Sequence, residues 1–435
     1  MSINIQNWSL KRLKYIAICN AASLPEDHDP DATFKYIDIG CVTQGHVDLP
    51  EDETIFSVSP SRARRLAEPH DTVISTIRTY LRAVAEVPTS DTDLVFSTGF
   101  AVLHPKPIGN PRFLAYHCQS DKSVDRVVAN SVGVSYPAIT ASQLMSSDLL
   151  LPPPAEQKQI ADFLDRETKQ IDNLIAEQEG LVENLTERRA AAIDQTVLGG
   201  LDVLRSPAPA VTPDDRTLRK GSHLAVEPEL LKMPNNWKVV RFKAAMQRLD
   251  ERNVGSKFTM MSLKISGEVV PRASLNSRQE PSIEGIPRYL IARQGDLVVN
   301  PMWLTGGSIG VSQVVGAVSP DYRVFRSRGF HEPRYLHHLM RSRPYIRQYK
   351  LYTRSDTTFD RRVQQGDLDN LPVAVPPLEE QREIADYLDG RTFKTDALIE
   401  EAKALIDLLK ERRSALISAA VTGKIDVRSE VLSRG

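Results

Sequence analysis

The chain has 435 residues, 41% hydrophobic and 26% charged, with a formal net charge of -1 at pH 7. This composition excludes wholesale disorder and a membrane class, and the length predicts two or three domains. No apolar run approaches the roughly 18–20 residues that span a bilayer, and the opening residues lack the apolar core of a secretory signal. Cys19, Cys41 and Cys118 show no paired spacing, which predicts reduced thiols, a cytoplasmic location and no metal site.

Residues 1–150 predict a first mixed α/β domain. Strand-like runs occur at residues 34–39 and 71–75, between segments rich in turn-forming residues. The domain carries 13 Lys/Arg against 17 Asp/Glu, a net charge of -4. A contact between this domain and a polyanion would therefore be local, or would depend on charge that a partner supplies.

Residues 151–200 predict one long helix. Prolines precede it, a glutamate occupies its first turn, and apolar residues then recur at steps of three and four. No proline interrupts this pattern, and Gly199 and Gly200 mark its end. A helix of about 40–45 residues would be roughly 60–65 Å long at 1.5 Å per residue. Its single apolar stripe requires a partner.

The proline-rich segment 201–233 predicts an irregular linker, and residues 234–374 predict a second α/β domain. This domain carries 22 Lys/Arg against 12 Asp/Glu, a net charge of +10. Residues 323–362 alone contain 11 Lys/Arg and 3 Asp/Glu, with tyrosines interleaved. A basic segment with aromatic residues is typical of a nucleic-acid contact, although a solvated surface has the same composition.

Residues 375–427 repeat the first helix, and a short polar tail, 428–435, follows them. The segment 151–203 aligns with 375–427 without a gap, and 25 of 53 positions are identical. Two equivalent helices in one chain can pair antiparallel about a local pseudo-two-fold axis. Parallel pairing remains an alternative. We predict an α+β fold in which two α/β domains are separated by an antiparallel coiled coil.

Several motifs come close to catalytic signatures without matching them. Residues 300–303, Asn-Pro-Met-Trp, lack the second proline of an adenine methyltransferase motif, and we predict a turn that ends a strand. The glycines at 306–310 are too loosely spaced for a phosphate-binding loop. His337 and His338 are neighbours that diverge around a helix, so we predict surface or DNA-facing residues rather than metal ligands. The sequence therefore predicts a protein without catalytic residues.

The duplicated segment resembles a known family, the specificity (S) subunits of type I restriction–modification systems. The resemblance rests on the order variable half, P-P-x-x-E-Q-x-x-I-A-x-x-L-D, long helix ending in E-R-R and G-x-x-D-V, and then the same again. Residues 76–82 and 97–103, and residues 295–299, are similar to patterns in the target-recognition domains of that family. The resemblance covers essentially the whole chain.

This resemblance implies a DNA-binding subunit without catalysis. Each domain would read one half of a bipartite, asymmetric DNA site, and the helices would fix the gap between the halves. Two methyltransferase (M) subunits would bind S-adenosylmethionine and methylate adenine at N6, and restriction (R) subunits would add cleavage that uses ATP and Mg. Half-sites read from one side of a duplex lie roughly 34–36 Å apart. The alternatives are a self-contained methyltransferase or nuclease, and a coiled-coil adaptor without sequence-selective DNA binding.

The candidate DNA-binding residues are mostly arginines, because the guanidinium fork matches both guanine and phosphate. In the first half we expect base contacts from Arg78, Tyr80 and Arg82, and phosphate contacts from Arg62, Arg64 and Arg65. In the second half we expect base contacts from Arg323, Arg354, Arg361 and Arg362, and phosphate contacts from Arg341, Arg343, Arg347 and Lys350. Exposed apolar positions near the helix ends are the expected docking points for M subunits.

Overall fold

A computed structural model describes residues 7–133, 136–201, 227–231, 234, 236–255, 257–275, 283–329, 331–353 and 362–427. Internal contacts divide the chain into two compact units. Unit 1 comprises Met1–Glu179 and Lys403–Gly435, and unit 2 comprises Gly180–Ala402. Among the described helices, none is both long and apolar enough to cross a membrane. The predicted linker and tail fall largely outside the described residues.

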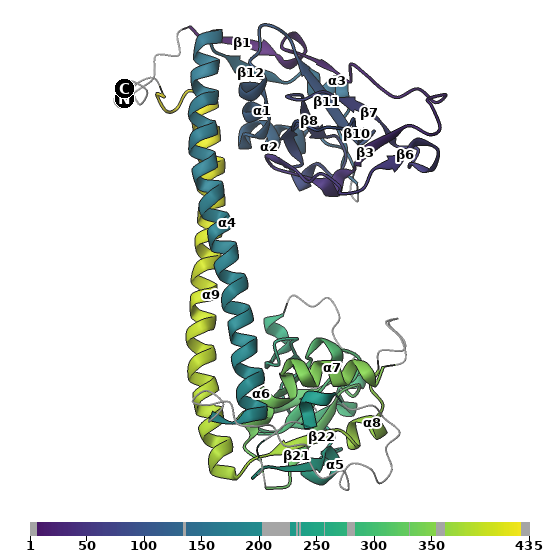
Figure 1. Ribbon diagram of the computed structural model, residues 1–435, viewed down its shortest axis with the longest axis vertical. Coiled ribbons are helices and arrows are strands. Elements are labelled where there is room, and N and C mark those ends of the chain that lie inside the picture. The colour runs from purple at the N-terminus through teal and green to yellow at the C-terminus, as the bar shows by residue number, and fades with distance from the viewer. Residues whose placement is uncertain are drawn as a thin grey trace. The chain divides into compact units, whose positions relative to one another are not determined.

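Two long helices each contribute to both units (Figure 1). Helix α4 (Pro154–Gly199) has 46 residues and helix α9 (Leu378–Val421) has 44. In unit 1, Arg413 Nε lies 2.8 Å from Asp172 Oδ1, and in unit 2, Arg189 Nε lies 2.9 Å from Asp396 Oδ1. Early residues of one helix thus meet late residues of the other. This arrangement confirms the predicted antiparallel pairing and excludes the parallel alternative.

Unit 1 is built on two four-stranded sheets, with strand orders β2-β11-β8-β9 and β6-β3-β10-β7. Its strands are β1 (Ser9–Arg12), β2 (Ala17–Cys19), β3 (Thr33–Ile37), β4 (Val42–Thr43), β5 (His46–Val47), β6 (Thr54–Ile55), β7 (Ala63–Ala67), β8 (Thr72–Ser75), β9 (Val84–Glu86), β10 (Leu94–Ser97), β11 (Phe100–Pro105) and β12 (Asp148–Leu151). Its shorter helices are α1 (Pro111–Gln119), α2 (Asp121–Ala129) and α3 (Ala141–Met145).

Unit 2 is built on one four-stranded sheet, with strand order β14-β21-β18-β19, and on three two-stranded ladders. Its strands are β13 (Lys238–Arg241), β14 (Met246–Leu249), β15 (Met261–Leu263), β16 (Val269–Pro271), β17 (Leu290–Ala292), β18 (Leu297–Val299), β19 (Ile309–Val311), β20 (Gly316–Val318), β21 (Arg323–Ser327) and β22 (Pro372–Val375). Its shorter helices are α5 (Phe242–Ala245), α6 (Pro333–Arg341), α7 (Arg343–Leu351) and α8 (Gln365–Asp369).

The two units share one framework. In each, the first strand pairs antiparallel with the strand that leads into a long helix, β1 with β12 before α4 and β13 with β22 before α9. Strands β2-β11-β8-β9 correspond to β14-β21-β18-β19. The first and last strands of each α/β part therefore lie side by side at the start of a long helix.

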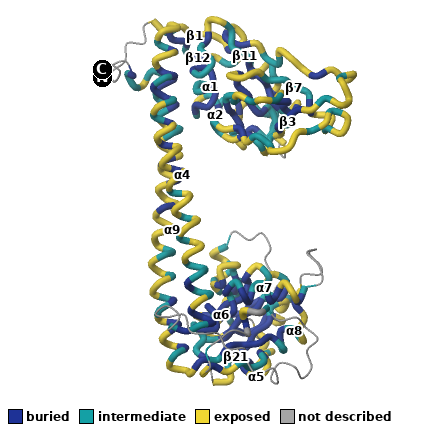
Figure 2. The backbone as a smooth tube through the Cα atoms, viewed as in Figure 1, coloured by how far each residue is buried: buried dark blue, intermediate teal, exposed yellow. Residues whose placement is uncertain are grey.

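The core of each unit continues into the helix pair. In unit 1, Phe113 of α1 belongs to the same buried cluster as Leu164 of α4 and Ile417 of α9. In unit 2, Tyr335 of α6 shares a buried cluster with Val197 of α4 and Leu388 of α9. Figure 2 shows this buried interior beside the largely exposed outer faces of the helices. Apolar burial therefore joins each α/β part to its own section of α4 and α9.

Candidate nucleic-acid interface

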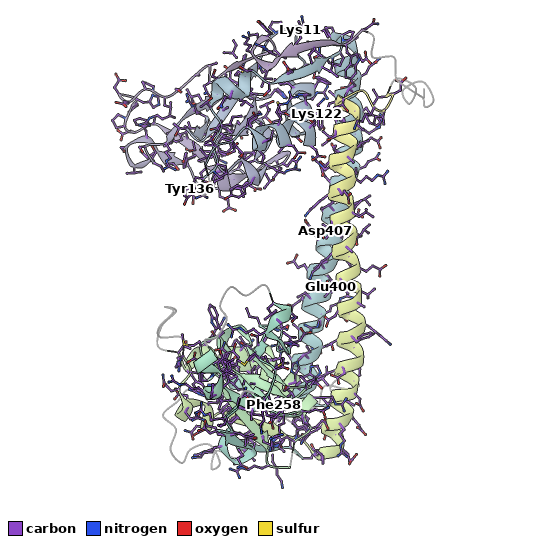
Figure 3. The ribbon with its side chains drawn as sticks, turned by 180° about the vertical axis from the view of Figure 1, so that it is seen from behind. Lys11, Lys122, Tyr136, Phe258, Glu400 and Asp407 are labelled. Atoms are coloured by element: carbon purple, nitrogen blue, oxygen red, sulfur yellow. The ribbon has the colours of Figure 1, made fainter. Side chains whose placement is uncertain are left out.

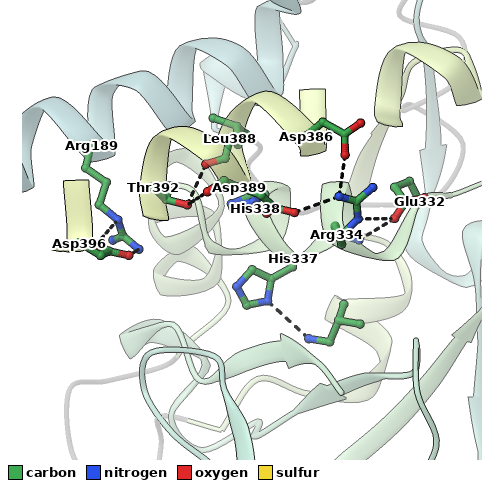
Figure 4. Close-up of polar contacts among 11 residues, drawn as sticks. Arg189, Glu332, Arg334, His337, His338, Asp386, Leu388, Asp389, Thr392 and Asp396 are labelled. Carbon is green, nitrogen blue, oxygen red and sulfur yellow. Dashed lines mark hydrogen bonds and ion pairs between the residues drawn. The ribbon is translucent and has the colours of Figure 1, made fainter. Parts of the chain in front are cut away.

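An arginine joins the α/β part of unit 2 to helix α9 (Figure 4). Arg334, in the first turn of α6, donates through Nη1 to Asp386 Oδ1 at 2.7 Å and to Asp389 Oδ2 at 3.1 Å. His338 Nε2, one turn later on α6, lies 2.7 Å from Asp389 Oδ1. This hydrogen bond from His338 is the main reason that the pKa of Asp389 is below its ordinary value.

Unit 1 has the same joint with one residue exchanged. Arg112, in the first turn of α1, forms ion pairs with Asp162 and Asp165 of α4. Tyr116 takes the place of the histidine, and its hydroxyl donates to Asp165 Oδ1 at 2.9 Å. Both aspartates belong to the duplicated I-A-D-x-L-D segment. The aspartates are thus repeated because each copy of the segment binds the arginine of one α/β part.

A buried glutamine completes each joint. The Oε1 atom of Gln157 accepts from Asn110 N at 2.7 Å, and its Nε2 donates to Pro152 O at 2.9 Å. Gln381 makes the same two bonds, from Glu332 N at 2.9 Å and to Pro376 O at 2.8 Å. Both side chains are fully buried. Each glutamine satisfies the N-terminus of α1 or α6 and the entry of a long helix at once.

Neither joint arginine was among the residues predicted from the sequence, although a signal was present. Pro-Arg-aromatic-Leu occurs at 111–114 and again at 333–336, each time at the start of a helix. The motif lies outside the aligned repeat. It was therefore not connected with the repeated aspartates, which only the tertiary structure brings against it.

The loop that follows β8 carries three of the predicted DNA-binding residues of unit 1. Arg78 and Arg82 both have a left-handed backbone, with φ of 50° and 55°. The Arg78 guanidinium lies 4.9 Å from the ring centroid of Tyr136, which projects from the surface of unit 1 in Figure 3. Tyr80 lies between Arg78 and Arg82 in the sequence, and its side chain is 55% exposed. Two strained non-glycine residues in one loop are typical of a functional site.

Arg82 is held by the fold, because its guanidinium pairs with Asp121 at 3.0 Å and Asp125 at 2.6 Å. The predicted phosphate contacts of unit 1 lie on or beside β7. Arg62 is exposed, and within the described residues its side chain has no partner. Arg64 stacks on Phe56 at 5.2 Å, and Arg65 Nη1 donates to Ser23 Oγ at 3.1 Å.

In unit 2, three of the predicted phosphate contacts are occupied within the fold. Arg341 Nη1 donates to the carbonyl oxygens of Ile265, at 2.8 Å, and Ile309, at 3.3 Å, and burial lowers its pKa to about 10. Arg343 pairs with Glu187 and Asp194 of α4. Arg347 pairs with Glu227 and Glu229. These contacts give each arginine a structural role, and their binding to DNA stays a prediction.

The remaining candidates of unit 2 differ in their surroundings. Lys350 and Arg362 are exposed, whereas Arg323 is only 9% exposed. Arg362 Nε lies 3.3 Å from Met302 Sδ, beside the loop that follows β18. Arg354 and Arg361 lie outside the described residues.

Some expectations for the basic segment of unit 2 were wrong. Tyr335, Tyr345 and Tyr349 are core residues with at most 1% exposure, because they lie on the inner faces of α6 and α7. His338 is buried against Asp389 and belongs to the joint rather than to the surface. Burial of His337 lowers its pKa to about 3. The interleaved aromatic residues thus reflect helix amphipathicity rather than base stacking.

The predicted turn at residues 300–303 is confirmed. Strand β18 ends at Val299, and Asn300 Oδ1 accepts from Met302 N at 3.1 Å. Trp303 is 47% exposed in this loop, which corresponds to the Tyr80 loop of unit 1. Among the described residues, no group of three or more His, Cys, Asp or Glu side chains could hold a metal ion.

We expected exposed apolar side chains near the ends of the long helices. Leu378, 37% exposed at the start of α9, fits this expectation, but most of them lie along the middle of the helices. Leu174 and Leu181 of α4 are 45% and 44% exposed, and their equivalents in α9, Leu398 and Leu405, are 51% and 40% exposed. The spacing of seven residues places each pair on one face of its helix.

Residues 6–183 match the family model of the type I restriction modification DNA specificity domain. A chain solved in work on complex assembly and conformational transition of the type I R-M system is 22% identical and has a TM-score of 0.67, covering 96% of this chain and 98% of that one. The HsdS subunit of Thermoanaerobacter tengcongensis is 21% identical, with a TM-score of 0.45 and coverage of 96% and 97%. The S subunit of M. genitalium is 13% identical, with a TM-score of 0.39 and coverage of 95% and 96%. No curated protein matches the chain by sequence.

The match covers the α/β part of unit 1 and the first part of helix α4, which together correspond to a DNA specificity domain. Unit 2 repeats the joint, the strand order and the long helix of unit 1. Residues 6–183 thus carry a type I restriction modification DNA specificity domain, and the chain as a whole has the fold of the solved chain with a TM-score of 0.67.

Proposed function

We propose that this chain is the DNA specificity subunit of a type I restriction–modification complex. Each α/β part reads one half of a bipartite, asymmetric DNA sequence. The observation that carries this proposal is a repeated framework with different loops. The joints at Arg112 and Arg334 are equivalent, whereas the loops after β8 and β18 differ in length and sequence. Equivalent frames with unlike loops are suited to reading two unlike half-sites.

In unit 1, DNA contact falls to Arg78, Tyr80 and Arg62, and backbone hydrogen bonds tie the segments that carry them to the turn between β10 and β11. Thr76 N donates to Gly99 O, and Thr98 N donates to Arg62 O, both at 2.8 Å. In unit 2, the corresponding loop contributes Trp303, and Lys350 and Arg362 add positive charge. Phosphate contacts position the protein and base contacts select the sequence.

The subunit itself is not an enzyme. Its M partners bind S-adenosylmethionine and transfer the methyl group to adenine, and its R partners use ATP and Mg. The equivalent leucines on α4 and α9 support two equivalent docking seams for two M subunits, because an exposed apolar face is covered in the assembled state. The complex acts in the cytoplasm, where the DNA is. The length of the helices sets the gap between the half-sites.

The test is co-expression with a type I methyltransferase subunit, followed by mapping of methylated adenine across a genome. Exchange of residues 76–83 for the loop of another specificity subunit is expected to alter one half-site and leave the other half and the gap unchanged. Insertion of one heptad into both long helices is expected to alter the gap alone. A coiled-coil adaptor would give no sequence-selective methylation or DNA binding in any of these chains.

A further inference from the structure

We propose that unit 2 binds a backbone phosphate of its DNA half-site through a cluster formed by Arg248, Arg323 and Arg362. This inference rests on the proposed DNA-binding function, and it assigns a ligand to a site that the framework itself does not require. It also replaces the expectation that Arg323 and Arg362 contact bases.

The strand register places two of these arginines on one face of the main sheet of unit 2. Arg323 of β21 is paired with Val299 of β18, and Phe325 of β21 is paired with Arg248 of β14. Residues two apart on a strand, and residues directly opposite on neighbouring strands, point to the same side. Arg248 and Arg323 are therefore diagonal neighbours on the face that carries Phe325.

The third arginine comes from a distant part of the sequence. Val363 N donates to Pro301 O at 3.1 Å, which attaches the segment after residue 361 to the loop that follows β18. Arg362 therefore lies near the end of β18, where Arg323 is paired with Val299. Burial lowers the pKa of Arg323, and the positive charges of Arg248 and Arg362, which both act electrostatically on it, lower it further.

In the described part of the chain, no carboxylate forms an ion pair with this cluster. Arg323 is 9% exposed, and its buried Nη1 atom has no hydrogen-bond partner. Among the described residues, none of the three arginines forms an ion pair. Asp369 is the carboxylate that acts on Arg323, but its Oδ1 atom accepts from Gln365 Nε2 at 2.6 Å. A buried cation without a partner is costly, and two further cations beside it increase that cost. Bound phosphate would offset it.

Unit 1 provides an internal control, because its equivalent strands carry no charge at these positions. Thr72 of β8 is paired with Leu103, and Leu103 is paired with Cys19 of β2. Leu297, Phe325 and Arg248 form the same row in unit 2. Two residues before Leu103 lies Ala101, which is fully buried and corresponds to Arg323. The framework thus folds with Ala and Cys where unit 2 has two arginines.

A phosphate fits this cluster better than a base edge does. The planar guanidinium binds phosphate oxygens in bidentate fashion. Arg248 and Arg362 both act on Arg323, so the cluster offers several donors to a phosphodiester with several acceptor oxygens. Arg323 is held in the middle of a sheet by two neighbouring strands, so its side chain does not extend into a groove. Arg362 is exposed at the rim and meets the duplex first.

The experiment compares the wild-type complex with M subunits and complexes carrying Arg323→Ala, Arg248→Ala or Arg362→Ala, using a labelled duplex that contains the mapped site. Each variant is expected to bind about 10-fold more weakly, and the slope of log K against log salt is expected to fall by about 1. The methylated sequence is expected to remain unchanged. Lys238→Ala, which removes an exposed charge from β13 of the same unit, is the matched control and is expected to bind like wild type.

A scan with single neutral methylphosphonates identifies the partner. One substitution in the unit 2 half-site is expected to weaken the wild-type complex about 10-fold and to cause no further loss in Arg323→Ala.

Altered base preference with an unchanged salt slope would overturn the proposal in favour of base readout. Loss of M-subunit assembly with unchanged DNA affinity would instead assign the cluster to an acidic partner segment. Because Arg362 is exposed, its variant keeps the test valid if Arg323→Ala does not fold. Absence of selective binding by the wild-type complex would contradict the proposed function itself.

Discussion

Units 1 and 2 agree where they meet the long helices and differ where they face outward. Arg112 with Asp162 and Asp165 corresponds to Arg334 with Asp386 and Asp389, and one buried glutamine supports each joint. The loops after β8 and β18 share no such equivalence: one carries two left-handed arginines, and the other an Asn-Pro turn and Trp303. Contacts that hold a module are thus retained, while contacts that face a ligand are free to diverge.

The comparison of the two units also separates arginines that bind within the fold from arginines that are available to contact DNA. Unit 2 has the larger positive charge, yet Arg341, Arg343 and Arg347 are occupied by carbonyl or carboxylate oxygens. Arg323 stands where unit 1 has a buried alanine. Net charge therefore overstates the number of arginines that unit 2 can offer to DNA.

The largest effect is expected from the buried glutamines. Gln157→Leu and Gln381→Leu leave a backbone N–H and a carbonyl oxygen without partners, which costs about 2–4 kcal/mol in the free energy of unfolding. Urea unfolding monitored by tryptophan fluorescence measures it, with Trp8 in unit 1 and Trp237 in unit 2. Similar losses for the two variants would support equivalent joints. A loss in one unit only would show that the joints are not equivalent.

The joint arginines are expected to contribute less, because their side chains are about one-third to two-fifths exposed. Arg112→Ala and Arg334→Ala should each lower the free energy of unfolding by about 1–2 kcal/mol. Arg112→Lys and Arg334→Lys keep the charge but lose the fork, so they should lie between wild type and alanine. Equal stability of the lysine and wild-type proteins would contradict a bidentate role.

Because His338 hydrogen-bonds to Asp389 in the unit 2 joint, we expect the free energy of unfolding to depend on pH in the acidic range. Since the pKa of Asp389 is lowered by folding, its contribution is present above the unfolded value of about 3.9 and is lost as pH falls through the folded value. His338→Phe removes the main cause of that shift. The stability difference between wild type and His338→Phe should therefore shrink as pH falls below about 4. Urea unfolding at a series of pH values tests this, and a difference that grows in acid would contradict it.

The smallest effect is expected from the ion pairs between the long helices. Asp172→Ala in unit 1 and Asp396→Ala in unit 2 remove partly exposed pairs, worth about 0.5 kcal/mol each. The effect should decrease in 1 M salt, which screens exposed charges. Thermal unfolding at low and high salt measures both values. A loss of several kcal/mol from either variant would show that these pairs, rather than apolar burial, hold the helices together.

The fold could be predicted to a large extent because its signals are local and repeated. The three- and four-residue spacing of apolar positions determines a long helix at 154–199 and at 378–421, and duplication within one chain supplies each helix with a partner. The pseudo-symmetry of the repeat favoured antiparallel pairing but left parallel pairing open, and the ion pairs between α4 and α9 decided between them. The turn at Asn300 was likewise predicted from neighbouring residues alone.

The burial and the binding partner of each charged side chain were decided by the tertiary structure. In the sequence, Arg323, Arg341 and Arg343 are alike, but the fold buries the first without a partner, places the second among carbonyl oxygens and pairs the third with α4. The repeated aspartates gained their meaning only when Arg112 and Arg334 were brought against them. Helical periodicity depends on residues a few positions apart, whereas the partner of a charge depends on contacts between residues that are distant in the chain.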